Sequence, residues 1–152
     1  MKRAAVLMYC LFCAVGLRAF DLQYGSLFRI TDIKLEHGRP ILPVTRGKYV
    51  NVRVLDKATF ELLKTCAPAC TQEGEGQTEI AAFRAAKTRP GMWIADVAVD
   101  HKWLLTFLVF AHKDGFSFIT PEPVAVSDTK WLARVKQALQ ARAQTTGKTN
   151  AM

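Results

Sequence analysis

Apolar and polar residues alternate along much of the chain after residue 20, which is the period of half-buried β-strands. In the segment 26–37 the apolar positions are first even-numbered and then odd-numbered, and the change falls at Thr31 and Asp32. Such a change of phase predicts a β-bulge at these two residues. The segment 38–43 contains two prolines, so a strand there is expected at a sheet edge.

The segment 48–65 favours a β-hairpin. Three valines alternate with polar residues, and a loop at 56–58 would place Arg53 opposite Glu61, a favourable cross-strand pair. The same residues allow a short helix over 58–64 instead.

Further along, alternation and apolar runs predict four more strands, and a Pro-Gly turn at 88–91 separates the first two. The expected strands are 79–86, 92–99, 103–111 and 116–120. The segment 103–111 is almost entirely apolar, which is typical of a central strand covered on both faces. The acidic segment 71–77, which precedes these four strands, predicts a flexible, solvated loop.

Residues 127–143 predict one long amphipathic helix capped by Ser127. Its apolar stripe consists of Trp131, Leu132, Val135, Ala138 and Leu139. Residues 144–152 offer nothing able to pack and are expected to form a disordered tail.

Together these elements predict a mainly β fold, an antiparallel β-sandwich that is immunoglobulin-like or related, with one C-terminal helix. The chain has 152 residues, of which half are hydrophobic and 22% are charged. This composition excludes a fully disordered chain and suits a single domain, expected here over residues 20–143. The three tryptophans, at 93, 103 and 131, are expected in its core.

Residues 1–19 have the pattern of a signal peptide. Lys2 and Arg3 precede an uncharged segment, 4–15, that is too short to span a bilayer, and cleavage is expected after Gly16 or Ala19. We therefore predict an exported protein, periplasmic or secreted. An uncleaved anchor, a buried core helix and a lipoprotein signal with Cys10 or Cys13 as the lipidated residue are the alternatives for the same residues.

The charge of the chain is moderately basic. Removal of residues 1–19 takes away Lys2, Arg3 and Arg18 and lowers the formal net charge from +8 to +5. No dense stripe of Lys and Arg with interleaved aromatic residues follows, so nucleic acid is not an expected partner.

Cys66 and Cys70 are the most specific chemical feature, and in an exported protein they predict a disulfide that closes a small loop. Their C-x-x-x-C spacing also resembles the copper-delivery motif of the Sco family. That resemblance implies an extracytoplasmic copper site with a histidine as third ligand, His101 in the alternative ligand set, chosen among His37, His101 and His112. It also implies a thioredoxin-like fold, although the βαβ pattern of that fold is missing from this chain. Thiol–disulfide exchange is a further alternative for the same pair.

The other clusters of polar residues do not predict a catalytic site or a cofactor. Asp96, Asp100 and His101 lie within six residues, and an Asp–His pair can orient an imidazole for proton transfer, but a solvated turn is the favoured explanation. Glu73, Glu75 and Glu79 lack the pattern of a calcium loop.

The first functional hypothesis is a non-enzymatic, exported protein that binds another envelope or extracellular protein. Free sheet edges and the basic residues Lys130, Arg134 and Lys136 are its expected contacts, and these residues also allow a weak contact with an anionic membrane surface. The second hypothesis is a small redox or copper-handling protein that uses Cys66 and Cys70. The third is a β-barrel that binds a lipid-like ligand.

Overall fold

The computed structural model describes residues 18–43 and 51–149. These residues form ten strands and two helices. In chain order they are β1 (Arg18–Tyr24), β2 (Phe28–Glu36), β3 (Arg39–Ile41), β4 (Val52–Val54), α1 (Lys57–Thr65), β5 (Ala69–Gln72), β6 (Thr78–Ala85), β7 (Met92–Val99), β8 (Trp103–His112), β9 (Gly115–Ile119), β10 (Val124–Val126) and α2 (Thr129–Thr149).

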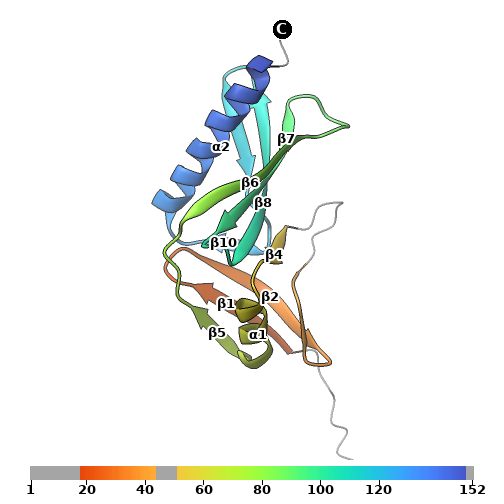
Figure 1. Ribbon diagram of the computed structural model, residues 1–152, viewed down its shortest axis with the longest axis vertical. Helices are drawn as coiled ribbons and strands as arrows, with labels where there is room; N and C mark the ends of the chain where they lie inside the picture. Colours follow the sequence, from red (N-terminus) through yellow and green to blue (C-terminus); the bar gives the residue numbers. More distant parts are fainter. Residues whose placement is uncertain (1–17, 44–50, 150–152) are drawn as a thin grey trace, which may run out of the picture.

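The strands form two separate sheets. Together with the C-terminal helix, they confirm the predicted mainly β fold. The first sheet has the order β10-β2-β1-β5, with β3 also on β2, and the second has the order β4-β8-β7-β6, with β9 also on β8 (Figure 1). All pairs are antiparallel except β1 with β5, which run parallel, so the prediction of a purely antiparallel fold is wrong at this pair. Because the strands do not close into one barrel, the hypothesis of a ligand-binding barrel is wrong too.

One apolar core joins the two sheets and both helices. Trp103 and Trp131 are fully buried in it, as predicted, whereas Trp93 is only partly buried. The helix α2 runs along the second sheet, and α1 lies beside the first (Figure 1). Large buried core side chains from the first sheet are Leu22, Tyr24, Phe28, Ile30 and Ile33, and those from the second are Val52, Trp103, Leu105 and Phe107.

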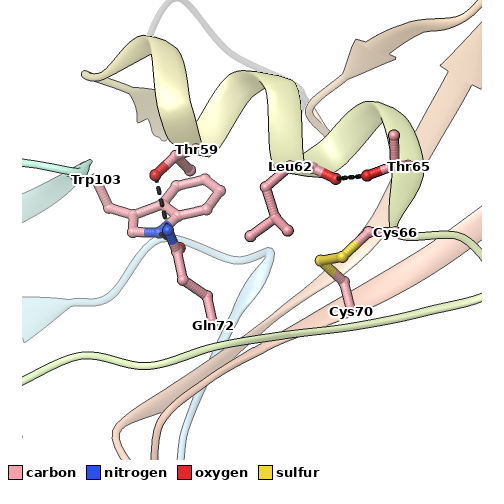
Figure 2. Close-up of a disulfide and its surroundings, with 7 residues drawn as sticks. All are labelled: Thr59, Leu62, Thr65, Cys66, Cys70, Gln72 and Trp103. Atoms are coloured by element: carbon pink, nitrogen blue, oxygen red, sulfur yellow. Dashed lines mark hydrogen bonds between the residues drawn. A yellow bond between two sulfur atoms is a disulfide. The ribbon is translucent and has the colours of Figure 1, made fainter.

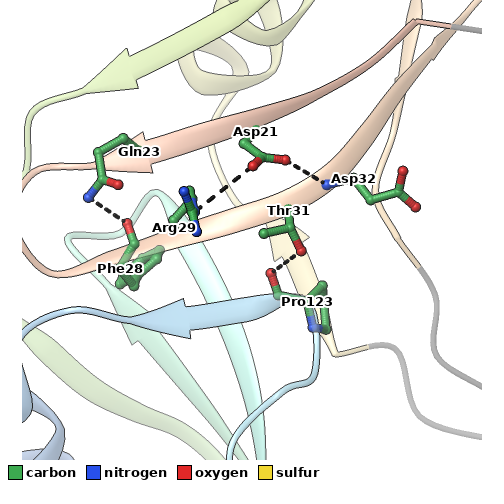
Figure 3. A network of polar contacts seen from close by, with 7 residues as sticks. All are labelled: Asp21, Gln23, Phe28, Arg29, Thr31, Asp32 and Pro123. Carbon is green, nitrogen blue, oxygen red and sulfur yellow. Dashed lines mark hydrogen bonds and ion pairs between the residues drawn. The ribbon is translucent and has the colours of Figure 1, made fainter.

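The bulge predicted in β2 is confirmed. Two residues, Thr31 and Asp32, lie opposite the single residue Asp21 of β1, and Asp32 has a φ of 60°. Both amides of the bulge are bonded, since the Asp32 amide donates to Asp21 Oδ1 at 3.1 Å and the Thr31 amide donates to the Pro123 carbonyl at 2.9 Å. Figure 3 shows the first of these bonds and the Thr31 hydroxyl, which donates to the same Pro123 carbonyl at 3.4 Å. The bulge thereby connects β2 to the segment before β10.

The predicted hairpin over 48–65 is wrong, and the alternative helix is correct. Lys57–Thr65 is helical, and the Asp56 side chain accepts the amide of Thr59 at its N-terminus. The valine strand β4 instead pairs with β8, which places Arg53 opposite Leu104 and not Glu61. A cap and a buried i, i+4 pair favour the helix locally, while the partner of β4 lies about fifty residues further along the chain.

The C-terminal helix is confirmed, with two corrections. Its cap is Asp128 and not Ser127, since Asp128 Oδ1 accepts the amides of Lys130 and Trp131, each at 2.9 Å. It also continues to Thr149, so residues 144–149 of the predicted disordered tail are helical. The buried stripe of this helix repeats every four residues and ends at the predicted end of the helix, residue 143. Its members are Trp131, Val135, Leu139 and Ala143.

Most of the predicted signal peptide lies outside the described residues. Only Arg18 and Ala19 are described, and both belong to β1, where they pair with Leu35 and Lys34 of β2. The four strands predicted between residues 79 and 120 are present as β6 to β9, and β8 is central, as expected.

Candidate functional site

Cys66 and Cys70 form a disulfide, with their Cα atoms 4.8 Å apart. Cys66 ends α1 and Cys70 lies in β5, so the bond ties the helix to the edge strand of the first sheet (Figure 2). Cys70 is buried and Cys66 is partly buried in the common core. This geometry fits a structural cross-link.

A polar bridge next to the disulfide holds the same two elements. The Gln72 side chain of β5 donates to Thr59 Oγ1 of α1 at 2.8 Å and accepts the indole N–H of Trp103 in β8 at 2.9 Å (Figure 2). Thr59 and Trp103 are fully buried, so without the Gln72 amide their polar groups would lack hydrogen-bond partners and destabilise the fold. Gln72 therefore joins α1, the first sheet and the second sheet at one point.

The structure does not assemble the alternative copper ligands. The two cysteines are joined to each other, and His101 lies in the β7–β8 turn, with Nδ1 4.0 Å from Glu79 Oε2. His37 is in the β2–β3 turn and His112 Nε2 is 2.6 Å from Ser117 Oγ. Within residues 18–43 and 51–149, no three His, Cys, Asp or Glu side chains form a group that could hold a metal ion.

Asp100 organises the loop between β5 and β6. Its carboxylate accepts the hydroxyl of Tyr24 at 2.6 Å, the amide of Gly76 at 3.0 Å and the amide of Gln77 at 2.8 Å. The Gly76 carbonyl in turn accepts the indole N–H of Trp131 at 3.2 Å. Three of these hydrogen bonds hold the loop at Gly76 and Gln77, so the prediction that it is flexible is wrong. Its side chains at Glu73, Glu75 and Gln77 are exposed, as expected of a solvated loop.

These contacts shift the pKa values of two groups in opposite directions. Burial, and then the hydrogen bond to Asp100, raise the pKa of Tyr24 well above its usual range. Burial alone would raise the pKa of Asp100, but hydrogen bonds from Tyr24 and from backbone amides outweigh it, and its pKa lies below the usual 3.8. At neutral pH the pair is thus a protonated phenol bonded to a carboxylate.

The Asp–His proton-transfer pair considered from the sequence does not form. The Asp100 oxygens are taken by Tyr24, Gly76 and Gln77, while His101 faces Glu79. Asp96 lies away from both, bonded to Arg84 and Thr106. An open depression of about 450 Å³ adjoins this turn, lined by Glu73, Gly74, Glu75, Gln77, Asp100, His101 and Lys102.

The helix α2 presents the predicted basic residues on its exposed side. Lys130 and Arg134 are exposed, and Lys136 is partly buried, with Nζ 6.0 Å from the centre of the Phe118 ring. Its other side is the buried stripe described above. Residues 129–149 contain five basic residues and no Asp or Glu. Neither α2 nor α1, the helices of the described ranges, is both long and apolar enough for a membrane span.

One groove was not foreseen from the sequence. A cavity of about 400 Å³ opens where β3, β4 and α1 meet, and its lining is mostly apolar: Pro40, Leu42, Val52, Arg53, Val54, Phe60 and Leu63. The predicted hairpin hid it, because that hairpin would have placed Phe60 and Leu62 in a strand beside β4.

No protein family model, curated protein or solved structure matches the chain. The function is therefore inferred from the contacts and charges of its own residues.

Proposed function

We propose that this chain is an exported, non-enzymatic interaction module of the cell envelope or periplasm, built as an immunoglobulin-like or related β-sandwich. Its exposed α2 surface binds an acidic region of a partner protein. The observation that carries the proposal is the charge of α2, five basic residues and no acidic one over residues 129–149. Such a field attracts anionic surfaces and raises association rates.

The attachment of α2 supports this role. The stripe from Trp131 to Ala143 is buried in the core, so the basic side chains project from a fixed support. Between residues 130 and 147 every exposed residue is Lys, Arg, Gln, Thr, Ala or Gly. This surface has the charge for electrostatic docking but lacks the large apolar side chains that insert into a bilayer.

The remaining polar groups support a binding role over catalysis. Asp100 and Gln72 have polar side chains of the kind found in active sites. Here both side chains form hydrogen bonds that hold the fold. The disulfide between Cys66 and Cys70 suits the oxidising compartment in which an exported protein functions.

The test is charge reversal on α2, read out by binding of poly-L-glutamate to the purified chain. The triple variant Lys130→Glu, Arg134→Glu and Arg142→Glu should lose at least about tenfold in affinity at low salt, since three attractive charges become repulsive. The matched control, Lys57→Glu with Lys87→Glu and Lys113→Glu, changes the net charge equally at exposed residues outside α2.

An equal loss in both triple variants would mean that only the net charge matters and would reject α2 as the binding surface. Vesicles of phosphatidylglycerol and phosphatidylcholine serve as the second probe. If they bind the unaltered chain at least as tightly as poly-L-glutamate does, and the α2 variant removes that binding, the partner is a membrane and the proposal fails.

A further inference from the structure

The second sheet ends at β6, and within residues 18–43 and 51–149 this strand pairs only with β7. Its eight residues make it the longest edge strand of the described fold. Thr78, Ala81 and Ala85 are exposed along it, so neither α1 nor α2 covers the edge. An uncovered edge strand presents unpaired N–H and C=O groups that can pair with a strand of another chain.

The hydrogen bonds to β7 determine which backbone groups of β6 point to the open edge. Just beyond the two ends of β6, the Ala86 amide donates to the Met92 carbonyl at 2.9 Å, and the Asp100 amide donates to the Gln77 carbonyl at 2.8 Å. Directly opposite residues of an antiparallel ladder are alternately bonded and not bonded. Counting inward from both ends therefore leaves an outward row of residues, whose N–H and C=O groups point away from β7: Thr78, Ile80, Phe83 and Ala85.

A β-bulge at the centre of β6 makes the outward row symmetric. Ile80 lies opposite Val97 and Ala82 lies opposite Asp96, so Ala81 is an extra residue in the ladder. The extra residue changes the phase of the strand, and the outward row therefore moves from even positions before it to odd positions after it. The row is thus identical when read from either end, with its centre between Ala81 and Ala82.

We propose that β6 pairs in antiparallel orientation with β6 of a second copy of this chain. The two-fold axis is perpendicular to the sheet and passes between Ala81 and Ala82. Ile80 then lies opposite Phe83 of the second copy, and Thr78 lies opposite its Ala85. Each pair occurs twice, and in each both residues direct their N–H and C=O groups at the other strand. The second sheets of the two copies become one continuous sheet.

The side chains agree with this register. Glu79 lies opposite Arg84 of the second copy, so the two charged residues of β6 form two pairs of opposite charge. These are non-hydrogen-bonded positions of the new ladder, where side chains approach most closely. One Arg84 nitrogen already binds Asp96 Oδ2 at 3.1 Å, and the guanidinium has further N–H donors for Glu79. On the core face, the partly buried Ile80 and Phe83 extend the apolar core across the axis.

The bulge selects a second copy of this chain as the occupant. A strand without a bulge alternates strictly, so its backbone groups match the outward row on only one side of Ala81. A copy of β6 carries the same extra residue at the same level and matches the whole row. A shift of the two copies by one or two residues loses at least two of the four outward pairs and sets Glu79 against Ala or Phe.

An edge-to-edge contact of this kind is small, so a dissociation constant in the micromolar range is expected. Sedimentation equilibrium of the purified chain, from about 1 to 500 µM, measures it. The average mass should rise with concentration from 16.9 kDa towards twice that value.

The change Ala85→Pro tests the backbone pairing. The N–H of Ala85 points away from β7, so proline removes no hydrogen bond within the chain but removes one from each of two pairs across the axis. The dissociation constant should rise at least about tenfold. Ala85→Ser keeps the N–H and is the matched control, which should dimerise like the unaltered chain. Circular dichroism verifies that both variants fold.

The change Glu79→Arg tests the register. It should raise the dissociation constant by about tenfold, because both pairs with Arg84 become repulsive. Glu122→Arg makes the same change of charge at an exposed residue outside β6 and should leave the dissociation constant unchanged.

Amide hydrogen exchange, followed by nuclear magnetic resonance at about 20 and 500 µM, locates the contact. The amides of the outward row should exchange several-fold more slowly at the higher concentration. A chain that stays monomeric at 500 µM overturns the proposal, as does a dimer whose newly protected amides lie outside β6. The α2 triple variant should dimerise at least as well as the unaltered chain, because both α2 helices lie on the same face of the joined sheet and the variant removes their repulsion. This result separates the dimer from the proposed acidic-partner site.

Discussion

At the scale of single residues, Asp100 connects parts of the chain that are far apart in sequence. Its carboxylate receives the Tyr24 hydroxyl from β1 and two amides from the β5–β6 loop. Asp100 and His101 have φ values of 50° and 54°, the left-handed conformation that a tight hairpin turn requires. The turn thus aims the carboxylate at the loop.

The bond between Tyr24 and Asp100 gives a testable change in stability. Tyr24→Phe removes one hydrogen bond to a charged group and should lower the free energy of unfolding by about 1–3 kcal/mol at pH 7. Urea denaturation measures this. The control is the exposed Thr65, whose hydroxyl donates to the Leu62 carbonyl at 3.2 Å, and Thr65→Val should cost less than about 0.5 kcal/mol, the size of an ordinary surface change.

The same pair sets an expected dependence on pH. The pKa of Asp100 is lowered, so its contribution is present above pH 3.8, its usual value, and is lost as the pH falls further. The pKa of Tyr24 is raised, so its contribution is complete below pH 10 and is lost as the pH rises beyond it. Tyr24→Phe should flatten the alkaline loss. An unchanged alkaline profile would contradict the assignment.

At the scale of elements, α1 is held to β5 both by the disulfide and by Gln72. Cys66→Ser with Cys70→Ser should therefore keep the fold and cost at most about 2 kcal/mol, since the closed loop is short. Thermal unfolding followed by circular dichroism measures the loss. Gln72→Ala in the oxidised chain is the comparison. A double serine variant that does not fold would mean that the disulfide, not the polar bridge, holds α1.

The start of β1 bears on the cleavage site left open by the sequence. Cleavage after Ala19 would remove Arg18 and Ala19, which pair with Leu35 and Lys34 in the β1–β2 ladder. Cleavage after Gly16 would keep the whole strand. We therefore expect an exported chain that begins at Leu17, and the intact mass of the secreted product measures it. A product that begins at Phe20 would contradict this expectation.

At the scale of the whole molecule, Trp131 joins α2 to both sheets. Its ring lies 5.5 Å from that of Phe28 in the first sheet, and its indole N–H donates to Gly76 in the loop that leads into the second. Trp131→Ala should cost about 3–5 kcal/mol because it leaves a large cavity and an unpaired carbonyl. The partly buried neighbour Leu132 is the control, and Leu132→Ala should cost clearly less in the same urea titration. Equal losses would show that Trp131 has no such linking role.

The sequence by itself determined what depends on local pattern. Alternation predicted the strands β6 to β9, a change of phase located the bulge at Thr31 and Asp32, and cysteine spacing predicted the disulfide. Each of these features follows from residues only a few positions apart, where side-chain period and backbone preference act directly.

Only the tertiary structure decided which segments meet. Two segments could pair with the valine strand β4, the adjacent one that would close a local hairpin and the distant strand β8. In the structure β4 pairs with β8. The loop at 73–77 is held by Asp100, which lies more than twenty residues further along the chain. Such pairings join residues far apart in the chain, and their free energy comes from burial and hydrogen bonds that no short window of sequence contains.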